Sequence, residues 1–164
     1  MRSINMLAIL LAGSLTVGSL ALSGPAGAMG PAEPSTGKGR NYTEGERAVK
    51  AKDYAKAVPL LERALNDNMR DADANNLLGY SHRKLGNTQT ALVYYQRALA
   101  IDPNHRGANE YLGELYVEMK DLPKAEERLT KLTQLCGTSC EEYRDLKAAI
   151  DQAKAAAPAP KTGT

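Results

Sequence analysis

The sequence contains no phenylalanine and no tryptophan, so eight tyrosines make up its whole content of these three aromatic types. All eight lie between Tyr42 and Tyr143. Large aromatic side chains supply much of the packing area of a small core. Their distribution therefore separates a folded middle from two ends that have no aromatic residue to pack.

Cysteine and histidine are also scarce, with two of each in 164 residues. Four-ligand zinc modules and disulfide-dense scaffolds need more of these residues, so we predict no metal site and no cofactor. The formal net charge is only +2, and a balance this close gives no reason to expect a nucleic-acid partner. What remains is one ordinary domain, with room for tails.

The first 28 residues have the pattern of a secretory signal peptide. Residues 3–32 carry no formal charge, and Arg2 alone precedes them. An apolar run at residues 6–22 is followed by Pro25 and by Ala26-Gly27-Ala28, which predicts cleavage after Ala28. The alternative is an uncleaved membrane anchor, although the run is shorter than the about 20 residues of a spanning helix. Either way, we expect the rest of the chain to be periplasmic or secreted.

Two further segments have compositions that do not favour folding. Residues 29–40 are rich in Pro, Gly and Ser, and residues 156–164 contain an Ala-Pro repeat. We therefore expect a disordered linker and a disordered tail, with the folded part at residues 41–155.

A repeat of 34 residues runs through this middle part. Five columns keep the same spacing in three copies, at residues 38–71, 72–105 and 106–139. Four of these columns are Gly45, Gly79 and Gly113; Ala57, Ala91 and Ala125; Asp53, Asn87 and Asp121; and Leu61, Tyr95 and Leu129. A fixed period of this length indicates an array of stacked supersecondary units.

Each copy predicts two helices. In the second copy, apolar residues recur at helical spacing on both sides of Gly86-Asn87, and Pro103 ends the second helix because proline cannot continue it. Small residues in the Gly and Ala columns let the paired helices approach closely. Asp53, Asn87 and Asp121 precede the second helices, where their side chains can cap free N–H groups.

Residues 140–155 predict a further helix with one apolar stripe, which includes Tyr143, Leu146 and Ile150, and a charged opposite face. Such a helix can cover the last repeat with one face and meet water with the other.

This pattern resembles the tetratricopeptide repeat family over about 100 of the 164 residues. The resemblance is carried by Leu78-Gly79, Ala91, Tyr95, Ala98 and Pro103, with matching positions in the other copies. It implies an all-α, right-handed solenoid of three helix-turn-helix repeats plus a C-terminal capping helix. The sequence departs from the family pattern at Asn41, Asn75 and Asn109, where the family usually has a large aromatic residue.

The resemblance also implies that the first helices of the repeats line a concave groove that binds another protein or an extended peptide. The implied groove residues are Tyr42, Glu46, Val49, Lys50, Asp73, Asn76, Tyr80, Arg83, Lys84, Glu110, Glu114, Val117 and Glu118. Family members that grip a C-terminal carboxylate have Lys and Asn at particular groove positions. Those positions here hold Tyr42, Glu46, Leu77, Gly107 and Tyr111, so that subtype is not expected.

The charge is unevenly distributed along the repeats. Residues 38–105 carry a net charge of +3 and residues 106–151 a net charge of −3. Glu110, Glu114 and Glu118 are spaced four apart, which stacks like charges on one helix face. Two interpretations remain: the stripe awaits a basic partner, or Arg106 and solvent screen it.

Cys136 and Cys140 are the only thiols. In an oxidising compartment we expect them to form a disulfide that joins the last repeat to the capping helix; free thiols and a redox or metal role are the alternatives. We expect His82 to be at least half-buried and His105, at a repeat junction, to be exposed.

No Gly-rich phosphate loop, G-x-S-x-G, H-E-x-x-H or Cys/His nucleophile pattern is present, so we do not expect an enzyme. The expected function is a non-catalytic protein-interaction module with an envelope assembly, scaffold or co-chaperone role. The alternative is an accessory subunit of a periplasmic enzyme or transport complex. We expect no membrane contact for the mature domain, unless the N-terminal segment is uncleaved.

Overall fold

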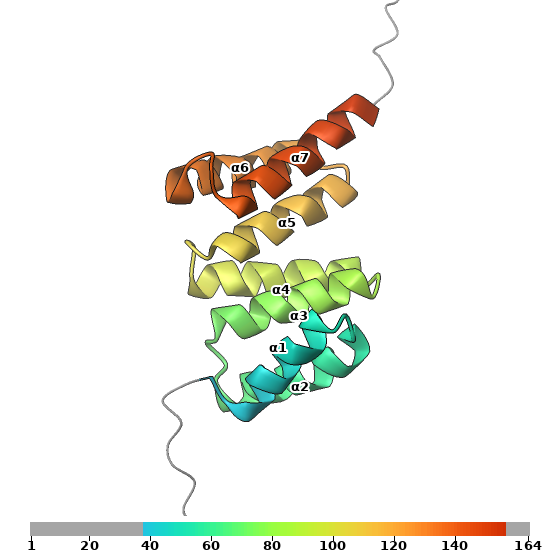
Figure 1. Cartoon of the computed structure of the whole chain (residues 1–164), viewed down its shortest axis with the longest axis vertical. Helices are drawn as coiled ribbons and strands as arrows, with labels where there is room; N and C mark the ends of the chain where they lie inside the picture. The colour runs from blue at the N-terminus through green and yellow to red at the C-terminus, as the bar shows by residue number, and fades with distance from the viewer. Residues whose placement is uncertain (1–37, 157–164) are drawn as a thin grey trace, which may run out of the picture. The chain divides into compact units, whose positions relative to one another are not determined.

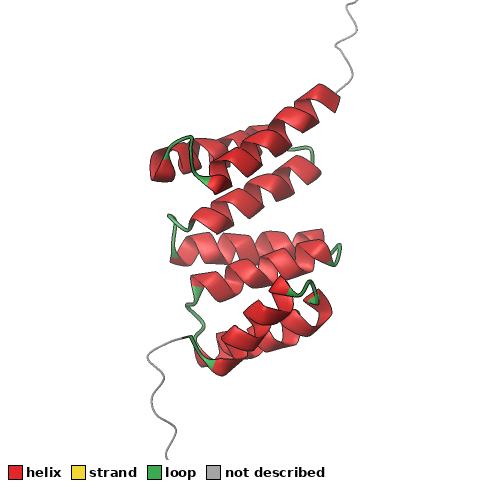
Figure 2. Ribbon diagram, viewed as in Figure 1, coloured by secondary structure: helices red, strands yellow, loops and turns green. Residues whose placement is uncertain are grey.

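The computed structural model describes residues 38–156 as an all-α array (Figures 1 and 2). The predicted signal peptide, residues 29–37 of the predicted linker and residues 157–164 of the predicted tail lie outside these described residues. The helices are α1 (Arg40–Lys50), α2 (Tyr54–Asp67), α3 (Ala72–Lys84), α4 (Thr88–Ile101), α5 (Arg106–Glu118), α6 (Leu122–Cys136) and α7 (Glu141–Ala156). No strand occurs between residues 38 and 156, so the expected all-α class is confirmed.

The helices form three antiparallel pairs, α1 with α2, α3 with α4, and α5 with α6, and α7 packs on both α5 and α6. Figure 1 shows the pairs stacked in chain order, with α7 at the end of the stack. Contacts of α1 with α3, of α3 with α5, and of α5 with α7 place these four helices in one layer. The first helices and the capping helix therefore share one side of the solenoid.

Two predicted boundaries differ from the structure. The side chain of Lys38 bonds to Asp71 at 2.9 Å and to Asp73 at 2.6 Å, and α1 begins at Arg40. Residues 38–40 are therefore part of the fold rather than of the linker, because ion pairs to residues at the start of α3 hold Lys38 in place. The capping helix extends to Ala156, which the sequence assigned to the tail.

The glycine column marks the places where helices approach most closely. A Cβ atom at Gly79 would lie 2.6 Å from the ring of Tyr95, and one at Gly45 would lie 2.7 Å from Leu61. A Cβ atom at Gly113 would instead collide with Leu146 of α7. Leu129 is the third-repeat equivalent of Leu61 and Tyr95. Opposite Gly113, Leu146 of the capping helix therefore lies closest to the glycine instead of Leu129.

Two of the three expected helix caps form. The carboxylates of Asp53 and Asp121 accept hydrogen bonds from the backbone N–H groups of Lys56 and Lys124. Asn87 makes no such bond, so its predicted cap is wrong; its amide nitrogen lies 3.3 Å from Nδ1 of His82 instead.

The core is built from aliphatic side chains, alanines and one tyrosine. Ala57, Ala91 and Ala125 are fully buried, as is Tyr95. Within residues 38–156, no helix has the length and apolar character that crossing a membrane requires.

Candidate functional site: the face of α1, α3 and α5

A hollow of about 320 Å³ lies where α1, α3 and α5 come together. Its apolar lining comes from Val49 and Leu77, and three tyrosine rings stand around it. The ring centroids of Tyr80 and Tyr111 are 4.9 Å apart, and those of Tyr54 and Tyr80 are 5.8 Å apart. Tyrosine rings offer flat apolar faces with a polar tip, so the hollow suits an apolar or aromatic side chain of a partner.

Charged side chains surround this tyrosine hollow. Lys50 pairs with Glu46 at 3.0 Å, and Lys52 also lines the hollow. The amino group of Lys84 lies 5.2 Å from the centroid of the Tyr80 ring. Of the predicted groove residues, the structure therefore brings Glu46, Val49, Lys50 and Tyr80 to one hollow, with Lys84 beside it.

Four members of this hollow are not among the predicted groove residues: Lys52, Tyr54, Leu77 and Tyr111. Tyr54 is the first residue of α2, and the repeat pattern assigns second helices to the outer layer. Lys52 lies in the preceding turn with a φ of 60°. No local pattern marks either residue, because their approach to Tyr80 depends on how the first two repeats stack.

A second group of predicted residues forms an ion-pair cluster between repeats two and three. Arg83 of α3 bonds to Glu118 at 2.7 Å through Nη2, and its Nη1 bonds to Glu114. The Arg83 side chain is only 9% exposed. Burial alone would lower the pKa of Arg83, but its bonds to the two glutamates raise that pKa overall. Val117 lies beside this cluster in a hollow that α7 helps to line.

This cluster answers the question that the glutamate stripe left open for Glu114 and Glu118. Arg83, rather than Arg106, neutralises two of the three glutamates, since Arg106 pairs with Glu142 of α7 at 3.0 Å. No local sequence pattern identifies Arg83 as their partner, because it is 31 residues from Glu114 and 35 from Glu118.

Glu110 is the third glutamate of the stripe, and its environment is different. It is 8% exposed and makes no hydrogen bond or ion pair with any residue in the described part of the chain. Burial, together with the neighbouring carboxylates of Glu114, Asp145 and Glu142, raises the pKa of Glu110 to about 8. At neutral pH this carboxyl therefore keeps its proton.

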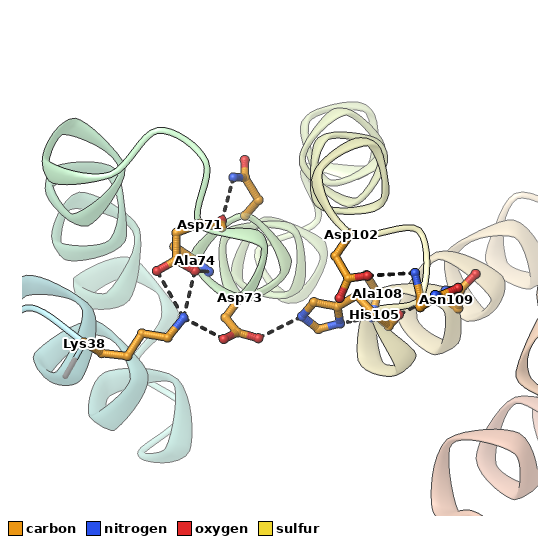
Figure 3. A network of polar contacts seen from close by, with 10 residues as sticks. Lys38, Asp71, Asp73, Ala74, Asp102, His105, Ala108 and Asn109 are labelled. Atoms are coloured by element: carbon orange, nitrogen blue, oxygen red, sulfur yellow. Dashed lines mark hydrogen bonds and ion pairs between the residues drawn. The ribbon is translucent and has the colours of Figure 1, made fainter. Parts of the chain in front are cut away.

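A third group of predicted residues links the starts of three first helices (Figure 3). Asp73 bonds to Lys38 and, at 2.9 Å, to Nε2 of His105, and Nδ1 of His105 accepts a bond from the N–H of Ala108. Because Nδ1 accepts, the proton of neutral His105 resides on Nε2. Tyr42 joins this group through Lys38, whose amino group lies 4.3 Å from its ring centroid.

The predicted exposure of His105 is wrong, since its side chain is only 14% exposed. The residue caps α5, and a helix start at a repeat junction is buried by the repeat before it. Burial would raise the pKa of Asp73, but Lys38 and His105 outweigh this effect and lower it. Asp73 is therefore committed to holding repeats together, not free for a partner.

Asn76, the last predicted groove residue, is 6% exposed. Its Oδ1 atom is fully buried and has no hydrogen-bond partner among the described residues. The amide nitrogen of the same side chain faces Gly107 at the start of α5. Asn76 is therefore buried where α3, which also carries Arg83, meets the start of α5.

The two cysteines lie at the junction between α6 and α7. Cys136 ends α6, Cys140 precedes α7, and their Cα atoms are 5.9 Å apart. That separation is within the range that a disulfide spans.

Comparisons with known proteins give the family. Residues 42–106 match one tetratricopeptide repeat model and residues 82–150 match another. A curated relative, the uncharacterized protein ycf37 of Pyropia yezoensis, is 38% identical over 71 residues, which cover 43% of this chain. The match spans only 40% of that relative's length.

Two solved structures illustrate the similarity in fold. MamA 41-end from Desulfovibrio magneticus RS-1 is 29% identical with a TM-score of 0.56, over 58% of this chain and 54% of that one. The first TPR of Spaghetti (RPAP3), bound to the HSP90 peptide SRMEEVD, is 16% identical with a TM-score of 0.63, over 70% of this chain and 90% of that one. At that identity the second match shows the fold alone. With two family models that together span residues 42–150 and the same helical stack in solved structures, this chain belongs to the tetratricopeptide repeat family.

Proposed function

We propose that this chain is a non-catalytic interaction module that binds an extended peptide or protein segment on the face of α1, α3 and α5. The observation that carries the proposal is the tyrosine hollow, where Tyr54, Tyr80 and Tyr111 surround an apolar floor. Partly exposed aromatic side chains in a shallow depression are typical of residues that dominate binding energy. The Spaghetti domain, which shares the fold, carries a bound peptide in its structure.

The chemistry of the hollow indicates what it would bind. An apolar side chain of the segment fills the space above Val49 and Leu77, and its backbone lies across the tyrosine rings. Ion pairing already engages Glu46 with Lys50, so the tyrosines rather than these charges supply the larger part of the affinity.

Substitution of Tyr80 or Tyr111 by alanine is expected to weaken binding of such a segment by at least about tenfold, because a buried aromatic contact contributes more than about 1.4 kcal/mol. A peptide selected from a random display library serves as the probe, and fluorescence anisotropy measures its dissociation constant.

Tyr94 provides the matched control, since it is half-buried on α4 and stacks on His82 at 5.5 Å between ring centroids. Tyr94→Ala should leave the peptide affinity within about twofold of wild type. Circular dichroism checks that each variant is folded. Equal losses for Tyr80→Ala and Tyr94→Ala would show that the hollow is not the binding site.

We further propose that residues 1–28 direct export, that the mature protein is periplasmic or secreted, and that its role is in envelope assembly or as a scaffold or co-chaperone. The charge-free N-terminal sequence with its Ala26-Gly27-Ala28 site supports export. The proximity of Cys136 and Cys140 supports the same compartment, because disulfides persist in oxidising surroundings.

Mass spectrometry of the protein secreted by its native host tests both points. The mature chain should begin at Met29, and its mass should rise by about 2 Da on reduction as two thiols take up hydrogen. Alkylation of Cys136 and Cys140 should occur only after reduction. Labelling before reduction would mean that the thiols are free.

A further inference from the structure

We propose that Glu110 receives a basic side chain, Lys or Arg, from the bound segment, so that the α5–α7 end of the interaction face selects partners by positive charge. The inference rests on the proposed function and adds the chemistry of the partner. It starts from the one glutamate of the stripe that the fold leaves without a cation.

Glu110 is isolated by the pairing of its neighbours. Arg83 forms ion pairs with Glu114 and Glu118, and Arg106 forms one with Glu142. Within residues 38–156, no cation or hydrogen-bond donor pairs with the carboxyl group of Glu110, although the residue is only 8% exposed. Buried carboxyl groups are normally paired, so this one has the environment of a site whose partner comes from outside.

The surroundings of Glu110 favour a cation. The charge that acts on it from its own helix is that of Glu114, and α7 contributes the charges of Glu141, Glu142 and Asp145. From α3, Arg83 is already committed to Glu114 and Glu118. Residues 106–151 as a whole carry a net charge of −3. An incoming ammonium or guanidinium group thus enters a region of negative potential, which is the complementarity that steers charged partners.

A ligand can reach Glu110 from solvent. Its carboxyl oxygens are not among the fully buried side-chain atoms that lack a partner, whereas Oδ1 of nearby α3 residue Asn76 is. The Glu110 oxygens therefore retain some contact with water.

Binding of a basic side chain would be coupled to loss of a proton. Because burial and like charges raise the pKa of Glu110 to about 8, its carboxyl group is protonated at pH 7 in the free protein. A lysine ammonium that pairs with it stabilises the carboxylate, so the O–H bond breaks and the proton passes to the buffer. The ammonium keeps its own three protons and forms the ion pair.

Display selection tests the charge preference directly. A random dodecapeptide library is selected against the wild-type chain, Glu110→Gln, and the matched control Glu127→Gln, whose side chain is 67% exposed on α6. We expect wild type and Glu127→Gln to enrich peptides with Lys or Arg at a constant distance from an apolar residue. Glu110→Gln should lose that basic position and bind the wild-type peptides about tenfold more weakly.

Calorimetric titration of the chain with one selected peptide, in two buffers of different ionisation enthalpy, measures how many protons are released on binding. At pH 7 the wild type should release about one proton per peptide, and Glu110→Gln should release close to none. Selected peptides without a basic position, or equal proton release by both proteins, would overturn this inference while the proposed function stands. If the wild type selects no peptide at all, the proposed function itself is wrong.

Discussion

Replacement of Tyr95 by alanine is expected to lower the free energy of unfolding by about 3–5 kcal/mol, the usual range for removing a buried aromatic side chain. Tyr95 is fully buried and packs with Ala91, Leu112 and Leu115. Its ring lies directly over Gly79, where a Cβ atom would come within 2.6 Å. The cavity would therefore open between the second and third repeats.

Urea denaturation followed by far-ultraviolet circular dichroism measures this loss. Tyr94→Ala is the control, because the neighbouring residue on α4 is only half-buried and stacks on His82. We expect Tyr94→Ala to cost less than about 2 kcal/mol. If the two variants unfold at the same urea concentration, Tyr95 does not hold the second and third repeats together as its burial indicates.

The second large effect is expected for Arg83→Met, which should lower the free energy of unfolding by about 2–4 kcal/mol. Removal of one partner from a buried ion pair leaves the other charge uncompensated. Here the loss would leave Glu114 unpaired beside Glu110, and the exposure of Glu118, at 51%, keeps the effect below that of a fully buried pair. Methionine keeps most of the volume of the side chain, so the measured loss reflects its charge and hydrogen bonds.

A double-mutant cycle isolates this contribution. Glu114→Gln in the Arg83→Met background should recover part of the lost stability, because it removes the uncompensated charge, and the two changes should be non-additive. Arg63→Met, at an exposed position on α2, is the control and should stay within about 0.5 kcal/mol of wild type. Additive effects of Arg83→Met and Glu114→Gln would show that the pair contributes nothing to stability.

The helical pairs of this fold could be predicted because their signals are local. The 34-residue spacing of Gly45, Gly79 and Gly113 marks close approach of helices, and Pro103 marks the end of α4 at Ile101. The same reasoning gave a wrong prediction where a residue type can make either of two local contacts. Asn87 stands in a capping position, but its amide turns to His82, because asparagine offers a donor as well as an acceptor.

The groove was predictable only in part. Tyr80, Val49 and Lys50 could be predicted because the family resemblance implies that these positions of the first helices face the groove. Tyr54 does not, because it begins a second helix and reaches Tyr80 through the stacking of two repeats. Lys38 was assigned to the linker for a similar reason. The segment around it has the composition of a linker, and its partners Asp71 and Asp73 are 33 and 35 residues away.

The sequence by itself determined that this protein is an all-α array of three repeats and a capping helix, because helix periodicity, small-residue columns and helix breaks act over short stretches of chain. Only the tertiary structure decided which charges are free. It pairs Arg83 with Glu114 and Glu118, Arg106 with Glu142, and leaves Glu110 alone. These pairings depend on the rotation and stacking of helices from different repeats, and no local pattern encodes either of them.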